Sequence, residues 1–181
     1  MAGRLIDEDP ELAYEHAQAA ARRAGRVDVV REAAALTAYA TGRYGEALRE
    51  FRTVRRLSGV DAHRALEADC ERGLGRPDRA LALLAEAPSD LSLDERAELA
   101  IVEAGARSDL GELEAALSVL DHVRSKALAA ETAERIEEVR HGVLVALGRA
   151  EPRQDPEAGT DDEDGAPDED VLGIDDLSED G

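Results

Sequence analysis

Aromatic residues and cysteine are scarce in this chain of 181 residues. It has one phenylalanine, three tyrosines and no tryptophan, so its core has to be built from leucine, valine and many alanines. Small side chains each bury little area, and we expect stability to be spread thinly over many helix contacts. The single cysteine, Cys70, cannot form an internal disulfide, and its place on an apolar helical seam favours a buried, reduced thiol.

Long apolar runs and lysine are also missing. No stretch approaches the roughly 18 apolar residues of a membrane span, and the first ten residues turn acidic at once, unlike a signal peptide. We therefore expect a cytoplasmic protein that does not bind membranes. Lys126 is the only lysine among 22 basic residues, which indicates a GC-rich genome rather than a particular chemistry.

Negative charge is concentrated near one end. Residues 151–181 carry 14 acidic residues against the single Arg153, whereas residues 1–150 carry 28 acidic and 21 basic residues. The last sixth of the chain therefore holds about two thirds of the net charge of -20. Its prolines, glycines and charge density predict disorder. The sequence thus predicts a domain over residues 1–150 and a disordered acidic tail over residues 151–181.

A short pattern occurs three times within the predicted domain. It runs Gly-Arg-Tyr-Gly-Glu-Ala-Leu from Gly42, Gly-Arg-Pro-Asp-Arg-Ala-Leu from Gly75 and Gly-Glu-Leu-Glu-Ala-Ala-Leu from Gly111, with the first glycines 33 and 36 residues apart. A repeat of this length indicates a stack of helix pairs. Apolar residues at helical spacing between glycine and proline breaks predict eight helices and no strand. The helices cover about 10–24, 28–41, 43–57, 60–74, 76–87, 92–109, 111–124 and 131–147.

The first copy continues into the spacing Gly-x-Tyr-x-x-Ala-x-x-x-Phe. The residues concerned are Gly42, Tyr44, Ala47 and Phe51. This run resembles the second helix of a tetratricopeptide repeat, whose period is about 34 residues. Seven positions before each repeat glycine, where the family's two helices touch, the chain has Ala35, Ala68 and Ala104. The resemblance covers roughly residues 9–148 and implies an all-α fold, an α-solenoid of antiparallel helix pairs with about three full repeats and flanking single helices.

The chain also departs from the family pattern. The tryptophan-like position early in the first helix of each pair holds Arg31, Arg64 and Ala100, and the closing proline is present only as Pro88. The motifs therefore specify the fold much better than the function. The whole run also resembles uncharacterised repeat proteins of high-GC bacteria, which implies no activity.

In this family the first helix of each pair lines a concave groove that holds a protein partner. The resemblance places that groove at Val29, Glu32, Leu36, Tyr39, Ala62, Ala65, Asp69, Arg72, Glu98, Ile101, Gly105 and Ser108. The Lys and Asn clamp of members that bind chaperone tails is missing, because Glu32 with Leu36 and Ala65 with Asp69 occupy its positions. A peptide partner is then expected to offer apolar or basic groups to Tyr39, Leu36 and Asp69. Each groove residue also fits a plain packing or solvated role.

Residue patterns typical of catalysis are not found. The histidines at positions 16, 63, 122 and 141 are scattered without metal-ligand spacing, and the glycines end helices instead of forming a phosphate loop. We therefore expect no enzyme activity, no cofactor and no metal. The acidic run 160–165 fails as a calcium loop because unsuitable Thr160 and Val171 would fall on ligand positions.

An arginine stripe at Arg49, Arg52 and Arg56 follows helical spacing. Nucleic acid would suit such a stripe, but the domain and the tail are both acidic and repel phosphate. Glu46 and Glu50 lie at pairing distance along the same helix. We expect a solvated, salt-linked face and no nucleic-acid partner.

Two features near the chain ends bear on assembly. Gly3-Arg4-Leu5 resembles the turn at Gly42, as if the helix at 10–24 lacked its first partner. This helix is expected either to pair across a homodimer or to belong to a fragment or a chain with a misassigned start, and we favour the fragment. In the tail, four apolar residues among acids either dock as a short motif or belong to a solubilising tail. They are Val171, Leu172, Ile174 and Leu177.

The leading interpretation is a non-catalytic adaptor that holds a protein partner in its concave groove. The alternative is a self-assembling or autoregulated structural protein whose tail docks in its own or a neighbour's groove. A third interpretation is an accessory subunit of an enzyme complex. The sequence names neither the partner nor the oligomeric state.

Overall fold

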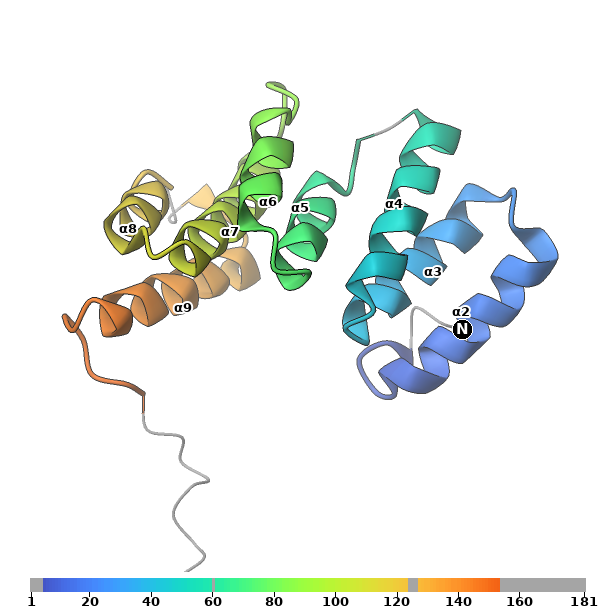
Figure 1. The fold of residues 1–181 in the computed structure, drawn as a ribbon, viewed down its shortest axis with the longest axis horizontal. Helices are drawn as coiled ribbons and strands as arrows, with labels where there is room; N and C mark the ends of the chain where they lie inside the picture. The colour runs from blue at the N-terminus through green and yellow to red at the C-terminus, as the bar shows by residue number, and fades with distance from the viewer. Residues whose placement is uncertain (1–4, 60, 124–126, 154–181) are drawn as a thin grey trace, which may run out of the picture. The chain divides into compact units, whose positions relative to one another are not determined.

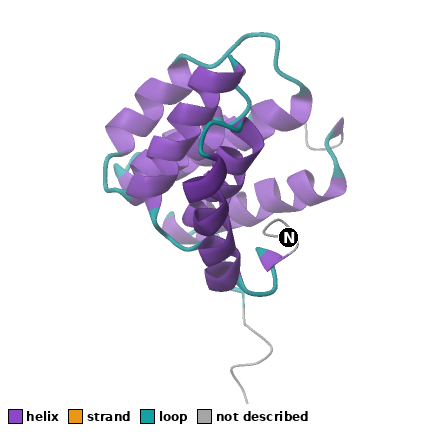
Figure 2. Cartoon of the chain, turned by 90° about the vertical axis from the view of Figure 1, so that its right-hand side faces the viewer, coloured by secondary structure: helices purple, strands orange, loops and turns teal. Residues whose placement is uncertain are grey.

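The computed structural model describes residues 5–59, 61–123 and 127–153. These residues form eight α-helices joined by loops and contain no strand (Figure 1, Figure 2). The all-helical prediction is thereby confirmed for the described part of the chain. The helices are α2 (Pro10–Ala24), α3 (Asp28–Ala40), α4 (Tyr44–Ser58), α5 (Arg64–Gly73), α6 (Pro77–Ala85), α7 (Leu93–Asp109), α8 (Leu113–Asp121) and α9 (Ala130–Ala146).

The helix ends follow local chemistry. Gly42, Gly75 and Gly111 have φ angles of 70°, 72° and 78°, in the left-handed region that costs other residues about 1–2 kcal/mol. Pro77 lies in the first turn of α6, where its missing N–H breaks no hydrogen bond. Ser92 caps α7 through a reciprocal pair of hydrogen bonds with Glu95. The helix ranges predicted from these signals are close to the observed ones. The largest difference is that α5 begins at Arg64 rather than at residue 60.

Consecutive helices pack against each other throughout the described chain (Figure 1). In addition, α7 contacts both α5 and α9, the helices two places before and after it. The chain divides into Met1–Glu151 and Pro152–Gly181, and all eight helices belong to the first unit. The tail predicted to be disordered lies outside the described residues from residue 154 onward.

Three apolar clusters form the core, and each contains a pair of alanines at a contact between consecutive helices. The pairs are Ala35 with Ala47, Ala68 with Ala80, and Ala104 with Ala116, all fully buried. Such small side chains allow two helix axes to approach closely. The largest fully buried side chains are Phe51, Leu120 and Ile136, so few bulky residues support the core.

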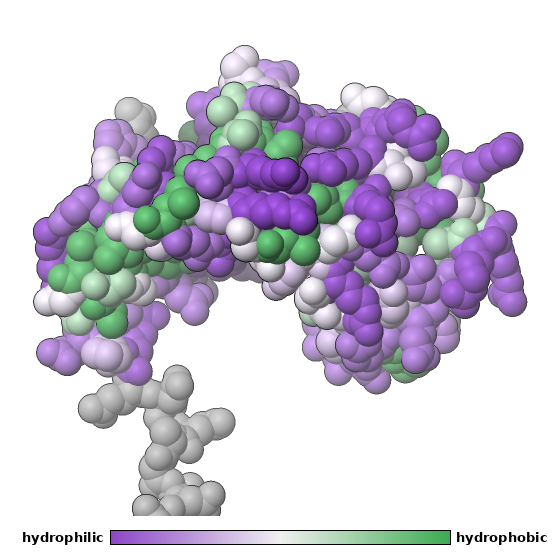
Figure 3. Space-filling model, viewed as in Figure 1, coloured by the Kyte–Doolittle hydropathy of each residue, from purple (hydrophilic) through white to green (hydrophobic). Residues whose placement is uncertain are grey.

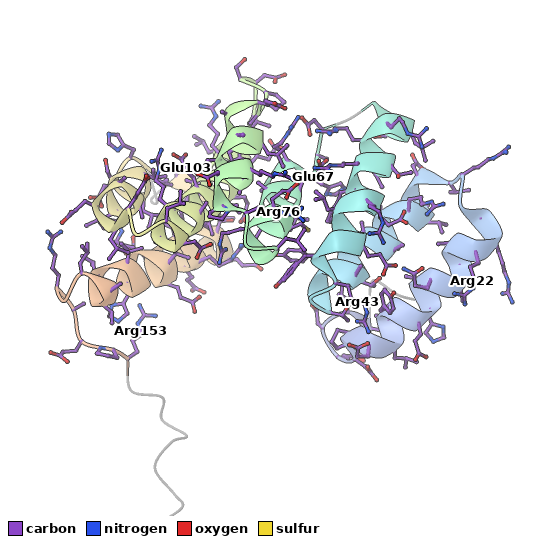
Figure 4. All side chains as sticks on the ribbon, in the orientation of Figure 1. Arg22, Arg43, Glu67, Arg76, Glu103 and Arg153 are labelled. Atoms are coloured by element: carbon purple, nitrogen blue, oxygen red, sulfur yellow. The ribbon has the colours of Figure 1, made fainter. Side chains whose placement is uncertain are left out.

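The contact between α4 and α5 also has a charged part. Glu67 and Glu71 of α5 are 1% and 3% exposed, although both are carboxylic acids. Arg55 of α4 lies 3.5 Å from Glu67, which Figure 4 labels, and Arg52 lies 3.0 Å from Glu71, both measured between side-chain nitrogen and oxygen. Helices α4 and α5 are therefore joined by ion pairs as well as by apolar contacts.

The arginine stripe on α4 does not pair as expected from the sequence. Within the described residues, Glu46 accepts hydrogen bonds from Tyr14 Oη and Gln18 Nε2, and Glu50 binds Arg31 with a shortest distance of 2.8 Å. These two acids belong to the face of α4 that packs toward α2 and α3. The expected pairs along α4 are therefore replaced by pairs with other helices.

The visible surface is largely hydrophilic (Figure 3). No helix among the described residues is both long and apolar enough to span a membrane.

Candidate functional site

Residues of α3, α5, α7 and α9 and of two loops surround an open cavity of about 330 Å³, which we call the α5–α7 groove. Its apolar residues come mainly from α5 and α7. They are Tyr39, Ala62, Ala65, Leu66, Leu91, Leu99, Ile101 and Val102. Its polar residues are Asp61, His63, Arg64, Asp69, Arg72, Glu95, Glu98 and Arg135.

Tyr39 and Asp69 link α3 to α5 beside the groove. The Tyr39 hydroxyl donates a hydrogen bond of 2.6 Å to Asp69 Oδ2, and its ring packs edge-on against Tyr44 at a centroid distance of 5.9 Å. Burial, together with the neighbouring carboxylate, raises the pKa of Tyr39 above its ordinary value, so this phenol stays protonated. Tyr39 therefore acts as a hydrogen-bond donor held in one orientation.

Arg72 links α5 to the end of α7. Its Nη1 donates to Asp69 Oδ1 at 2.7 Å, and its Nε donates to Asp109 Oδ2 at 2.8 Å. Burial opposes its charge, but the Asp69 and Asp109 carboxylates outweigh that effect and raise the pKa of Arg72. A Cβ placed on Gly105 would stand 3.0 Å from Arg72 Nη1, so this glycine leaves room for the guanidinium.

The other charged groups of the groove also have partners nearby. Arg135 of α9 binds Glu98 of α7 at 2.6 Å, and Arg64 binds Asp61. Glu95 accepts a hydrogen bond from the backbone N–H of Ser92 just before α7. Hydrogen bonding to the Ser92 side chain and to this backbone N–H lowers the pKa of Glu95. Opposite charges therefore compensate one another at Arg135 with Glu98 and at Arg64 with Asp61, whereas the partner of Glu95 is a backbone N–H.

The structure brings together seven of the twelve residues that the sequence placed in a groove. Tyr39, Ala62, Ala65, Asp69, Arg72, Glu98 and Ile101 line the cavity. The other five do not line it: Val29 is 62% exposed, Leu36 packs against the apolar cluster around Phe51, and Glu32 pairs with His63 at 2.9 Å. Ser108 donates to the Ala104 carbonyl, and Gly105 lies beneath Arg72.

Sequence reasoning missed nine of the sixteen residues that line the cavity. Leu91 belongs to a loop, Arg135 comes from the last flanking helix, and Leu66, Leu99 and Val102 neighbour predicted positions. A helix turns by 100° per residue, so residues adjacent to a groove position also reach the cavity wall. Adjacency to a predicted groove position could therefore have indicated Leu66 and Val102. No feature of the neighbouring sequence indicated Arg135.

The expected contact of Asp69 with a basic group of a partner stays a prediction, and within the protein this side chain already has two partners. Its two carboxylate oxygens already accept hydrogen bonds from Tyr39 and Arg72. A partner cation would have to compete with a guanidinium that is already in place. Asp69 thus links α3 to α5 through Tyr39 and also orients Arg72.

Two further predictions concern α2 and the apolar residues of the tail. On α2, for which pairing across a homodimer was the less favoured of two expectations, Ala13 and Ala17 are buried and Leu12 is 39% exposed. The tail residues Val171, Leu172, Ile174 and Leu177 lie outside the described residues, as does the acidic run 160–165. Among the residues that the structure describes, no group of three or more His, Cys, Asp or Glu side chains is placed to hold a metal ion.

No protein-family model matches this chain, and no curated protein shows a significant sequence match to it. The groove and the helix packing are therefore the features of this chain that bear on its function.

Proposed function

We propose that the chain is a non-catalytic adaptor of tetratricopeptide type that binds a segment of a protein partner in the α5–α7 groove. The repeat resemblance is supported by the three buried alanine pairs, each formed at a contact between consecutive helices. It is also supported by the left-handed glycine that separates α3 from α4, α5 from α6 and α7 from α8. On this reading the helix pairs form an α-solenoid of three repeats, with α2 and α9 as flanking helices.

The observation that carries the proposal is the cavity itself. A volume of about 330 Å³ lies near the lower end of the range found for pockets that enclose small ligands. The first helices of successive pairs, α3, α5 and α7, all contribute residues to it. In a repeat stack these helices present a continuous surface to a partner. A protein segment that lies across α5 and α7 would place one or two side chains in the cavity.

Comparative capture tests this function. The full-length chain, a Leu99→Arg variant and a Leu57→Arg control are used to capture proteins from a lysate of the encoding organism, and the retained proteins are quantified by mass spectrometry. Leu99 lines the groove, whereas Leu57 is 43% exposed on α4 and does not line it. We expect at least one protein to be retained by the wild type and the control but lost with Leu99→Arg. If the three baits retain the same proteins, the groove is not the binding site.

A further inference from the structure

The floor of the groove is apolar and partly exposed. Leu66, Leu99 and Ile101 are half-buried and line the cavity, and the buried Val102 lines it as well. Leu66 and Ile101 also pack against core clusters, but Leu99 belongs to none of the three clusters. A half-buried leucine that supports no core cluster is apolar surface left available for another molecule.

The charges around this floor offer no strong attraction to a charged ligand. The Asp69 carboxylate is bonded by Tyr39 and Arg72, and Glu98 is bonded by Arg135. A partner lysine or carboxylate would have to compete with these contacts, or at Glu95 with the hydrogen bond from the Ser92 backbone N–H, and would gain little in exchange. Charge complementarity therefore favours a neutral occupant.

Building on the proposed function, we propose that the occupant of the α5–α7 groove is an uncharged protein segment that inserts a large apolar side chain, of the leucine or phenylalanine kind, against Leu66, Leu99 and Ile101. A free carboxylate terminus and a basic cluster are not its recognition elements. Burial of apolar area depends only weakly on ionic strength, whereas binding through exposed charge pairs is screened by salt. Weak salt dependence of binding is the property that separates this occupant from a charged one.

The test uses the full-length protein and a displayed library of random peptides. Peptides are selected on the wild type and then sorted by whether they also bind two groove variants, Leu99→Arg and Ala62→Trp. Ala62 is exposed at the cavity wall, so the tryptophan fills the cavity without replacing a core side chain. Leu57→Arg is the matched control for the introduced arginine, and far-UV circular dichroism checks that each variant keeps its helical content.

We expect the groove-dependent peptides to share a large apolar residue and to show no excess of charged residues of either sign. A synthetic peptide of the selected sequence should bind Leu99→Arg at least about tenfold more weakly than wild type, as expected when one apolar side chain loses its burial. Its affinity should change by less than about twofold between about 0.1 M and about 0.5 M NaCl.

Two results overturn the inference in different ways. Groove-dependent peptides that are basic or acidic, and whose binding weakens more than about tenfold with salt, would refute the apolar occupant and leave the adaptor function standing. If no selected peptide responds to Leu99→Arg or Ala62→Trp, both the occupant and the proposed function are wrong.

Discussion

The buried pair of Glu67 and Arg55 leads to an asymmetric prediction for protein stability. Glu67 is 1% exposed and its Oε2 has no hydrogen-bond partner, while the Arg55 side chain is 34% exposed and lies 3.5 Å away. Removing Arg55 leaves a buried carboxylate with less compensation, whereas removing the carboxylate leaves a guanidinium that water can reach. Removing Arg55 and removing the Glu67 carboxylate should therefore change the free energy of unfolding by very different amounts.

For Arg55→Ala we expect a loss of about 3 kcal/mol in the free energy of unfolding, as for other buried charges deprived of a partner. In a chain of this size that loss corresponds to a Tm lowered by about 6–12 °C. For Glu67→Gln the expected change is within about 1 kcal/mol, because a neutral amide has a smaller desolvation cost than a carboxylate. Arg56→Ala, one residue away and exposed, serves as the control and should change stability by less than about 0.5 kcal/mol.

The pH dependence supplies a second readout. Burial raises the pKa of Glu67 above its ordinary value, and the Arg55 and Arg64 guanidiniums only partly oppose this. The folded state therefore holds this proton more tightly than the unfolded state. The resulting stabilisation is complete below the unfolded pKa of 4.5 and is lost as pH rises through the folded pKa. Without Arg55 the pKa of Glu67 in the folded state rises further. The loss of stability caused by Arg55→Ala should therefore be smaller at about pH 5 than at about pH 7.

Thermal unfolding followed by far-UV circular dichroism at both pH values measures these differences. Equal destabilisation by Arg55→Ala and Glu67→Gln at neutral pH, with no recovery in acid, would refute the reasoning from burial.

Three further predictions concern the core. Phe51→Ala should cost about 3–5 kcal/mol in urea unfolding because the ring is fully buried, and a loss below about 1 kcal/mol would show that the ring is not packed there. Gly73→Ala should lower the Tm because the added Cβ would stand 2.5 Å from the Tyr44 ring. Gly142→Ala on α9 meets open space and should stabilise the protein by about 0.5–1 kcal/mol. Equal effects of the two variants on the Tm would contradict the close contact at Gly73. Burial raises the pKa of the Cys70 thiol to about 12, so a thiol reagent should modify it far more slowly in the native than in the denatured protein, and equal rates would show an accessible thiol.

The helix ends were predictable because their signals are local. Gly42, Gly75 and Gly111 end one helix and begin the turn to the next, and each adopts the left-handed conformation that glycine allows most readily. The alanines seven positions before them are fully buried, as the repeat spacing required. Local backbone preference and burial both act through neighbouring residues, so a single sequence contains this information.

Partners distant in the chain were not predictable from spacing. Glu67 and Glu71 have the sequence character of exposed helix positions, but they are buried because Arg52 and Arg55 of α4 compensate their charge. Asp69 lines the α5–α7 groove, but its bond to Tyr39 depends on how α3 and α5 pack. Helical periodicity tells which face a residue occupies and leaves its charge partner on another helix undetermined.

Amide hydrogen exchange of the full-length protein, with and without a peptide selected on it, tests the central claim most directly. The account predicts slower exchange on binding within residues 64–73 and 93–102, where α5 and α7 line the groove. It also predicts unchanged exchange in α4 and α8, neither of which contributes a residue to the cavity. Protection confined to α4 or α8, with none in α5 or α7, would contradict the assignment of the groove as the binding site.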